Sequence, residues 1–142
     1  MLISTKGRYA LRVMIELAGY EKGEIVPLNT IAEKQNISEK YLESILAVLS
    51  KAGQIEGLRG KGGGYRLIKA PKEYSVGEIL RVAEGSLAPV ACLDCKPNAC
   101  LRAAECKTLP LWEKLDTIIC NYLDSVSLAD LANPSEIGDY NL

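Results

Sequence analysis

The stretch from Gln54 to Ile68 constrains the fold more than any other part of the chain. It predicts two short strands around a basic tip, because the tip glycines permit positive φ angles and a tight reversal. Arg59 and Lys61 lie where a hairpin tip projects its side chains. A phosphate-cradling nucleotide loop is the competing interpretation. It is disfavoured because its Gly-x-x-x-x-Gly-Lys-Ser/Thr order is missing and no capped helix follows at once.

Two helices are predicted before this hairpin. The first is short, from an Asn29 N-cap to about Gln35, and the second covers residues 39–52, between a Ser38 cap and Gly53. The second has an apolar face made of Tyr41, Ile45, Val48, Leu49 and Ala52. Its opposite face carries Lys40, Glu43, Ser44, Ala47 and Lys51. The helices alone fit a generic helical hairpin or a helix-turn-helix, and the hairpin that follows them favours a winged helix-turn-helix.

Other elements flank this unit. A first helix is predicted over residues 5–19, a short strand over 25–26, and a helix over 75–84. The apolar face of the first helix is Ala10, Val13, Met14, Leu17 and Ala18. Its basic residues, Lys6, Arg8 and Arg12, are either solvated or in contact with phosphate.

A long amphipathic helix is predicted to start at Thr108 and Pro110 and to span roughly 27 Å. Its apolar stripe consists of Leu111, Leu115, Ile118, Ile119, Tyr122, Leu123 and Val126. A stripe of this length outside a compact core needs a partner surface. We favour a second copy of the chain over packing back on the same domain.

Four of the five cysteines lie in one short stretch, Cys92–Cys106. Clustered thiolates bind soft metal ions and iron, so the stretch predicts a metal or iron–sulfur site over chance cysteines or a redox disulfide. Cys120 is interpreted as a packing residue. Histidine is absent, which excludes Ser–His and Cys–His catalytic arrangements and imidazole ligands.

The net charge of −1 hides an asymmetry. Residues 1–70 carry 11 Lys/Arg and 7 Asp/Glu, whereas residues 71–142 carry 6 and 11. A basic first half is what nucleic-acid contact requires, although the excess is modest. No signal peptide or membrane-spanning run is apparent, so we expect a cytoplasmic protein with no membrane partner, whose cysteines are kept reduced.

Several segments together resemble one family. They are Ser4-Thr-Lys-Gly-Arg-Tyr-Ala-Leu-Arg12, Ile37-Ser-Glu-Lys-Tyr-Leu-Glu43, Leu58-Arg-Gly-Lys-Gly-Gly-Gly-Tyr65, and Cys100–Cys106 followed by Leu111-Trp112. The chain is similar, up to about Ala132, to the bacterial winged-helix repressors typified by IscR, the iron–sulfur assembly regulator, and CymR, the cysteine-metabolism regulator. The resemblance implies a homodimer whose long C-terminal helices cross and whose winged helices bind a palindromic site in double-stranded DNA.

The expected fold is therefore mainly α with a small β wing. We divide it into a winged helix-turn-helix region (1–74), a cysteine loop with a long dimerisation helix (75–132) and a flexible tail (133–142). By resemblance, the recognition helix and wing contribute the DNA-binding residues Lys40, Tyr41, Glu43, Ser44, Arg59 and Lys61. Glu43 is expected to select sequence, because a carboxylate repels phosphate but accepts from a cytosine amino group.

The resemblance also implies that cysteines of the loop bind an iron–sulfur cluster, for which we favour the 2Fe–2S type. Cys100 and Cys106 fit the second and third ligands, and Cys92 the first. Some relatives use a histidine just after the third cysteine, and nitric-oxide-sensing relatives use a first-helix aspartate. Neither residue type is present at the matching place here, where the aspartate position is Arg8. Cys95 is our hypothesis for the fourth ligand, with a carboxylate or an exogenous thiol as the alternatives.

The predicted function is a dimeric repressor that senses iron–sulfur cluster status and controls cluster-assembly genes. One alternative is a cluster-free regulator of cysteine or sulfur metabolism that responds to a metabolite or partner protein. Another is a structural zinc site in the same loop. A thiol oxidoreductase using Cys92-x-x-Cys95 is disfavoured because no βαβ pattern surrounds that motif, so we expect no enzymatic activity.

Overall fold

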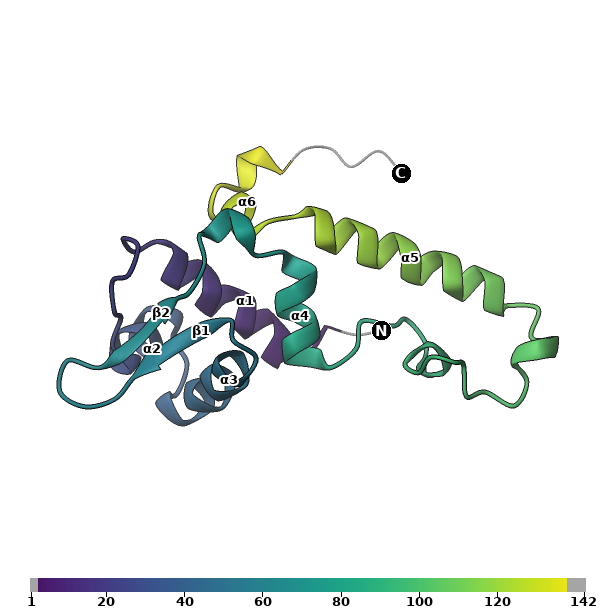
Figure 1. The fold of residues 1–142 in the computed structure, drawn as a ribbon, viewed down its shortest axis with the longest axis horizontal. Coiled ribbons are helices and arrows are strands. Elements are labelled where there is room, and N and C mark those ends of the chain that lie inside the picture. The colour runs from purple at the N-terminus through teal and green to yellow at the C-terminus, as the bar shows by residue number, and fades with distance from the viewer. Residues whose placement is uncertain (1–2, 138–142) are drawn as a thin grey trace.

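The computed structural model describes residues 3–137 and is mostly helical, with one small antiparallel sheet (Figure 1). The α-helices are α1 (Thr5–Ala18), α2 (Leu28–Gln35), α3 (Glu39–Lys51), α4 (Val76–Glu84), α5 (Leu109–Ser125) and α6 (Leu128–Ala132). The strands are β1 (Ile55–Leu58) and β2 (Gly64–Leu67). Four short 3-10 turns complete the order: Pro71–Glu73, Ala91–Leu93, Ala103–Glu105 and Pro134–Glu136. The predicted fold class is confirmed.

Serine caps fix where four of the described helices begin, and in α6 the Ser127 hydroxyl accepts from the Asp130 N–H. The hydroxyls of Ser4, Ser38 and Ser75 each accept a hydrogen bond from a backbone N–H in the first turn of α1, α3 and α4. The predicted Asn29 cap is wrong, because α2 begins at Leu28 and Pro27 occupies the N-cap position. Proline suits that position because it has no N–H that the helix would leave unpaired.

The buried face of α3 differs from the predicted one. Leu42, Ile45, Leu46 and Leu49 are buried in α3. Val48 is only half-buried and Ala52 is exposed, so the predicted apolar face is not the face that α3 buries. The helix is apolar over more than half its circumference, and its contacts with α1, α2, α4 and β1 decide which apolar residues face inward.

The hairpin forms as predicted. β1 pairs antiparallel with β2 from Ile55↔Leu67 to Leu58↔Gly64, and Gly60 and Gly62 in the turn have positive φ angles of 94° and 79°. The predicted strand at 25–26 is reduced to one bridge, in which Val26 and Tyr65 exchange two 2.9 Å backbone hydrogen bonds. A Cβ at Gly64 would collide with the backbone of Val26, so glycine permits this close approach.

The main core extends beyond the predicted winged unit. Ile79 and Leu128, which lie outside residues 1–74, belong to the same buried cluster as the inner faces of α1, α2 and α3. The backbone joins the same parts, because Val76 N donates to Val126 O (2.8 Å) and Leu128 N donates to Tyr74 O (2.9 Å). The buried core thus crosses residue 74, and the division of the chain into regions at that residue stays a prediction.

Helix α5 extends away from this core, and the loop of residues 85–108 runs out beside it to the end opposite the wing (Figure 1). None of the residues of Leu109–Ser125, all of which are described, is buried. Val126, predicted as the last residue of the apolar stripe, instead follows the helix and is buried with Val76 and Leu80.

The C-terminal tail is described only in part. Residues 133–137 include the Pro134–Glu136 turn, and the rest of the predicted flexible tail, 138–142, lies outside the described residues. Among residues 3–137, no helix combines the length and apolarity needed to cross a membrane.

Candidate nucleic-acid interface and cysteine loop

The outer face of α3 presents the predicted recognition residues to solvent. Lys40, Glu43 and Ser44 are exposed, and Tyr41 is half-buried. The Tyr41 ring meets the Tyr9 ring edge-on, with centroids 5.8 Å apart, so part of this side chain packs against α1. The Ser44 hydroxyl donates to the Tyr41 carbonyl at 2.6 Å, which leaves its oxygen able to accept from a ligand.

A hollow of about 450 Å³ separates α3 from the wing. Glu43, Ser50 and Lys51 line it from α3, and Gly57 and Arg59 line it from the wing. The structure thus brings Glu43 and Arg59, which are 16 residues apart in sequence, to one concave surface. Sequence analysis assigned no DNA-binding role to Ser50 or Lys51. Their spacing of seven and eight residues from Glu43, two helical turns, is the signal that could have found them.

Three cations of α3 and the wing have no partner within the described residues. Lys40, Arg59 and Lys61 are exposed, and they make no hydrogen bond or ion pair with any residue of 3–137. In contrast, Arg12 donates to Gln35 Oε1 (3.1 Å) and to the Gln35 carbonyl (2.7 Å). Arg12 therefore joins α1 to α2, whereas the three unpaired cations remain available to an anionic ligand.

The four loop cysteines are free thiols, and two of them lie at short 3-10 turns. Cys92 lies in the Ala91–Leu93 turn, and Cys106 ends the Ala103–Glu105 turn. Cys95 and Cys100 are exposed, and the Cys100 N–H donates to Asn98 Oδ1 at 2.8 Å. Cys106 Sγ lies 3.3 Å from Thr108 Oγ1. That hydrogen bond, helped by the backbone N–H groups of Thr108 and Leu109, lowers the pKa of the Cys106 thiol.

The donor chemistry of this loop suits a thiolate-bound iron or zinc centre, but its geometry does not gather the donors. Within residues 3–137, no three Cys, Asp or Glu side chains lie together in an arrangement that could hold a metal ion. Cys95 faces instead a hollow of about 270 Å³ shared with Glu113 and Asp116 of α5. The predicted ligands Cys92, Cys95, Cys100 and Cys106 are thus on one loop and are not brought together.

Cys120 is placed apart from that loop. It is half-buried on α5, and its thiol lies 3.7 Å from Asp116 Oδ1. The interpretation of Cys120 as a packing residue stays a prediction.

Two helices joined by a turn, a β-hairpin wing and exposed cations without partners among the described residues define a winged-helix DNA-binding protein. The chain belongs to the Rrf2 family, described as iron-dependent transcriptional regulators, whose family model matches residues 3–134. This confirms the family resemblance that the sequence motifs indicated.

Curated relatives point to both branches of the resemblance. IscR of Aliivibrio salmonicida is 36% identical over 137 residues, which are 96% of this chain and 80% of that protein. CymR of Bacillus subtilis is 39% identical over 133 residues, which are 94% of this chain and 91% of that protein. Both are named HTH-type transcriptional regulators, so the prediction that the chain is a regulator and not an enzyme is confirmed.

Solved structures agree with these relatives. The structure of CymR, the global cysteine regulator of B. subtilis, has a TM-score of 0.75 at 39% identity and covers 94% of this chain and 98% of its own. T. potens IscR has a TM-score of 0.73 at 37% identity and covers 100% of this chain and 93% of its own. The fold and the regulator family are therefore shown.

Proposed function

We propose that this protein is a cytoplasmic, dimeric repressor that binds a palindromic DNA site and senses iron–sulfur cluster status through its cysteine loop, controlling cluster-assembly genes. The observation that carries the proposal is the set of four free thiols on one exposed loop beside α5, at the end opposite the wing. A sensing loop placed there can act on the arrangement of two DNA-binding units without touching DNA itself.

DNA binding is proposed through α3 and the wing. The N-terminal part of α3 enters the major groove, where Lys40 contacts phosphate or a guanine edge and Glu43 accepts from a cytosine amino group. Arg59 binds the minor groove or the adjacent phosphate, with Lys61 beside it. The support for these roles is that the cations are exposed and unpaired within the described residues.

Dimerisation is proposed through α5. The side chains of Leu111 and Leu115 are 59% and 37% exposed, although both lie on the apolar stripe. A second α5 that crosses the first would remove this apolar surface from water, at roughly 25 cal/mol per Å². Two-fold symmetry of the dimer would then match a palindromic operator.

Cys92, Cys100 and Cys106, with Cys95 as the fourth ligand, are the residues that would hold a cluster. When bound, a cluster supplies a redox-active iron centre whose potential depends on its ligands and its exposure to solvent. Because these thiols are not gathered in the structure, the loop must rearrange to bring them together. A coupling of ~1–3 kcal/mol between that rearrangement and DNA binding would change affinity by about 5- to 150-fold.

Anaerobic purification followed by a visible spectrum and iron and sulfide assays tests the cluster. We expect brown protein from the wild type and from Cys120→Ala, a matched cysteine outside the loop. We expect no cluster from Cys92→Ala, and an altered spectrum from Cys95→Ala. An unchanged spectrum in Cys95→Ala would refute its role as the fourth ligand. Colourless wild-type protein after anaerobic reconstitution would refute the cluster sensor, and colourless protein containing zinc would support a structural zinc site.

A specific feature also favours the cluster-free alternative. A pocket of about 330 Å³ lies between the end of α1 and the base of the wing, lined by Leu17, Lys22, Arg66, Ile68 and Pro71 among others. Its lining, which combines apolar and charged side chains, suits a small amphipathic metabolite. If the protein is colourless, cysteine and cystine are the first probes, and a change in thermal stability that Lys22→Ala abolishes would support this function.

A further inference from the structure

Three charged residues of α4 each bond a different part of the molecule. Glu78 Oε1 accepts from Gln54 Nε2 (3.0 Å) and Lys69 Nζ (3.3 Å), which lie at the base of the wing. Glu78 is followed on α4 by Arg81 and Glu84, so these three charged residues are spaced by three positions. Each step of three residues turns the side chain by about 300°, so the three side chains point in successively different directions around the helix.

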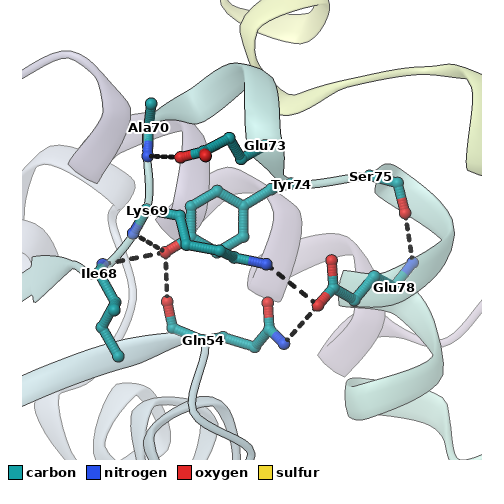
Figure 2. A network of polar contacts seen from close by, with 8 residues as sticks. All are labelled: Gln54, Ile68, Lys69, Ala70, Glu73, Tyr74, Ser75 and Glu78. Carbon is teal, nitrogen blue, oxygen red and sulfur yellow. Dashed lines mark hydrogen bonds and ion pairs between the residues drawn. The ribbon is translucent and has the colours of Figure 1, made fainter.

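The base of the wing is fixed by the Tyr74 hydroxyl (Figure 2). This hydroxyl donates to the Gln54 carbonyl at 2.7 Å and accepts from the N–H groups of Ile68 and Lys69, each at 3.0 Å. Gln54 precedes β1 and Ile68 follows β2, so one atom joins both ends of the hairpin. Tyr74 is 1% exposed and lies just before α4, and therefore the hairpin is held to the start of that helix.

A second contact bonds α4 to α5 through a bidentate ion pair. Arg81 Nη1 and Nη2 donate to the two carboxylate oxygens of Asp124, at 2.8 and 2.9 Å. Gly77 permits this contact, because a Cβ at that position would collide with the Asp124 carboxylate. The side chains of the pair are 40% and 44% exposed, so it adds little to stability. Two parallel hydrogen bonds nevertheless define the orientation of the two helices.

Glu84 connects α4 to the start of α1. Its Oε1 accepts from the backbone N–H of Ser4 (2.9 Å) and from the Ser4 hydroxyl (2.7 Å). Glu84 is the last residue of α4 and is followed directly by the loop that carries the cysteines. Helix α4 is thus bonded at its start to the wing, in its middle to α5, and at its end to α1.

We infer that α4 is a rigid connection through which the position of α5 sets the position of the wing on DNA, with Arg81 and Glu78 as positioning residues. The inference rests on the proposed function, in which α5 forms the dimer and the wing contacts DNA. A shift of α5 moves α4 through Asp124 and Arg81, and α4 moves the wing through Glu78 and Tyr74. Neither Arg81 nor Glu78 touches DNA in this mechanism.

Hydrogen–deuterium exchange of the full chain tests the connection without DNA. In Arg81→Gln we expect faster exchange at the Ile68 and Lys69 amides, which the Tyr74 hydroxyl protects. Gly77→Ala should act in the same way, because it displaces the Asp124 carboxylate without removing a charge. Lys34→Gln is the matched control, since it breaks an exposed ion pair with Glu16 that joins α1 to α2. Exchange that changes only within α4 and α5 would overturn the inference.

Binding to a duplex selected by the wild-type protein from a random pool tests the effect on DNA. Arg81→Gln should weaken binding by about fivefold. In the Arg59→Ala background, where the wing contact is already lost, Arg81→Gln should weaken it by less than about twofold. Independent substitutions at distant sites multiply, within about twofold. If the losses of affinity caused by Arg59→Ala and Arg81→Gln multiply in the double variant, the inference is overturned. An equal loss of affinity in Lys34→Gln would also overturn it.

These arms separate the two failures. If the wild-type protein selects no duplex, the proposed DNA-binding function fails, while hydrogen–deuterium exchange still decides whether α4 connects α5 to the wing. Tyr74→Phe keeps the buried ring and removes only the hydroxyl, so it checks the wing side if Arg81→Gln or Gly77→Ala fails to fold. Tyr74→Phe should speed exchange at the Ile68 and Lys69 amides and leave exchange in α5 unchanged. Ile68 and Lys69 amides that stay protected in this variant would overturn the inference.

Discussion

Helices α3 and α5 are both amphipathic, but only α3 buries residues of its apolar stripe fully within one chain. Four residues of α3 are buried, whereas none of the residues of α5 is. The two helices also differ in place, since α3 packs among α1, α2, α4 and β1 and α5 extends away from that core (Figure 1). An apolar stripe by itself therefore predicts burial without saying whether the same chain or another one supplies the cover.

This comparison assigns different energetic roles to the two stripes. Substitutions in the α3 stripe should change the folding of each chain at any protein concentration. Substitutions in the α5 stripe should change association and leave the fold of a protomer intact.

The largest expected effect is on folding. Leu46→Ala in α3 should lower the free energy of unfolding by about 2–5 kcal/mol, because it leaves a cavity at a side chain with 0% exposure. Leu115→Ala, the matched substitution in α5, should cost less than about 1 kcal/mol in dilute monomer. Urea denaturation at two protein concentrations measures both. Equal losses that do not depend on concentration would break the distinction between the two helices.

The next effect is on association. A variant with both Leu111→Asp and Leu115→Asp should raise the dissociation constant of the dimer by at least about 100-fold, because two carboxylates would have to be desolvated in the interface. Sedimentation velocity measures the change, and circular dichroism should show a retained helical signal. Lys114→Asp, at an exposed position on the same helix, should remain dimeric. A dimer that survives the double substitution would place the interface elsewhere.

A smaller effect is expected on sequence selectivity. Glu43→Ala should reduce discrimination between variant operator sites by about 1 kcal/mol, roughly fivefold, since the carboxylate favours a cytosine amino group and repels phosphate. Arg59→Ala should instead weaken binding to all sequences and lower the salt slope by about one. Fluorescence anisotropy on a set of variant duplexes distinguishes the two patterns. An unchanged preference in Glu43→Ala would remove its specificity role.

The smallest effect concerns acid stability. The hydrogen bonds from Arg81 lower the pKa of Asp124 below its ordinary value of 3.8. A carboxyl with a lowered pKa in the folded state stabilises the protein above that ordinary value, and this contribution is lost as the pH falls through the folded-state pKa. Asp124→Asn should therefore be less stable than wild type at pH 6 by less than about 1 kcal/mol, with the difference shrinking on acidification. Urea midpoints between pH 6 and pH 3 measure this. A difference that grows on acidification would contradict it.

Much of the fold could be predicted because its signals are local. The Ser38 and Ser75 caps, the glycine-rich turn and the Pro110 start of α5 each depend on a few adjacent residues. The inward face of α3 was not determined in this way, because Leu46 and Val48 are equally apolar and only the packing of neighbouring helices chooses between them.

The same distinction between local signals and long-range contacts applies to the candidate site. The exposure of Lys40 and Arg59 follows from a helix face and a hairpin tip, which are local features. The distances among the loop cysteines depend on an aperiodic loop, in which sequence spacing does not determine separation in space. The contacts of Tyr74 and Arg81 join residues far apart in the chain, so no pattern in a single sequence predicts them.

The most direct test of the account is the affinity of the selected duplex for anaerobically reconstituted protein and for cluster-free protein, measured at one fixed salt concentration. We expect the two affinities to differ by about fivefold or more, and Cys92→Ala to bind equally under both treatments. Equal affinities of reconstituted and cluster-free wild-type protein would contradict the claim that the cysteine loop controls DNA binding through a cluster.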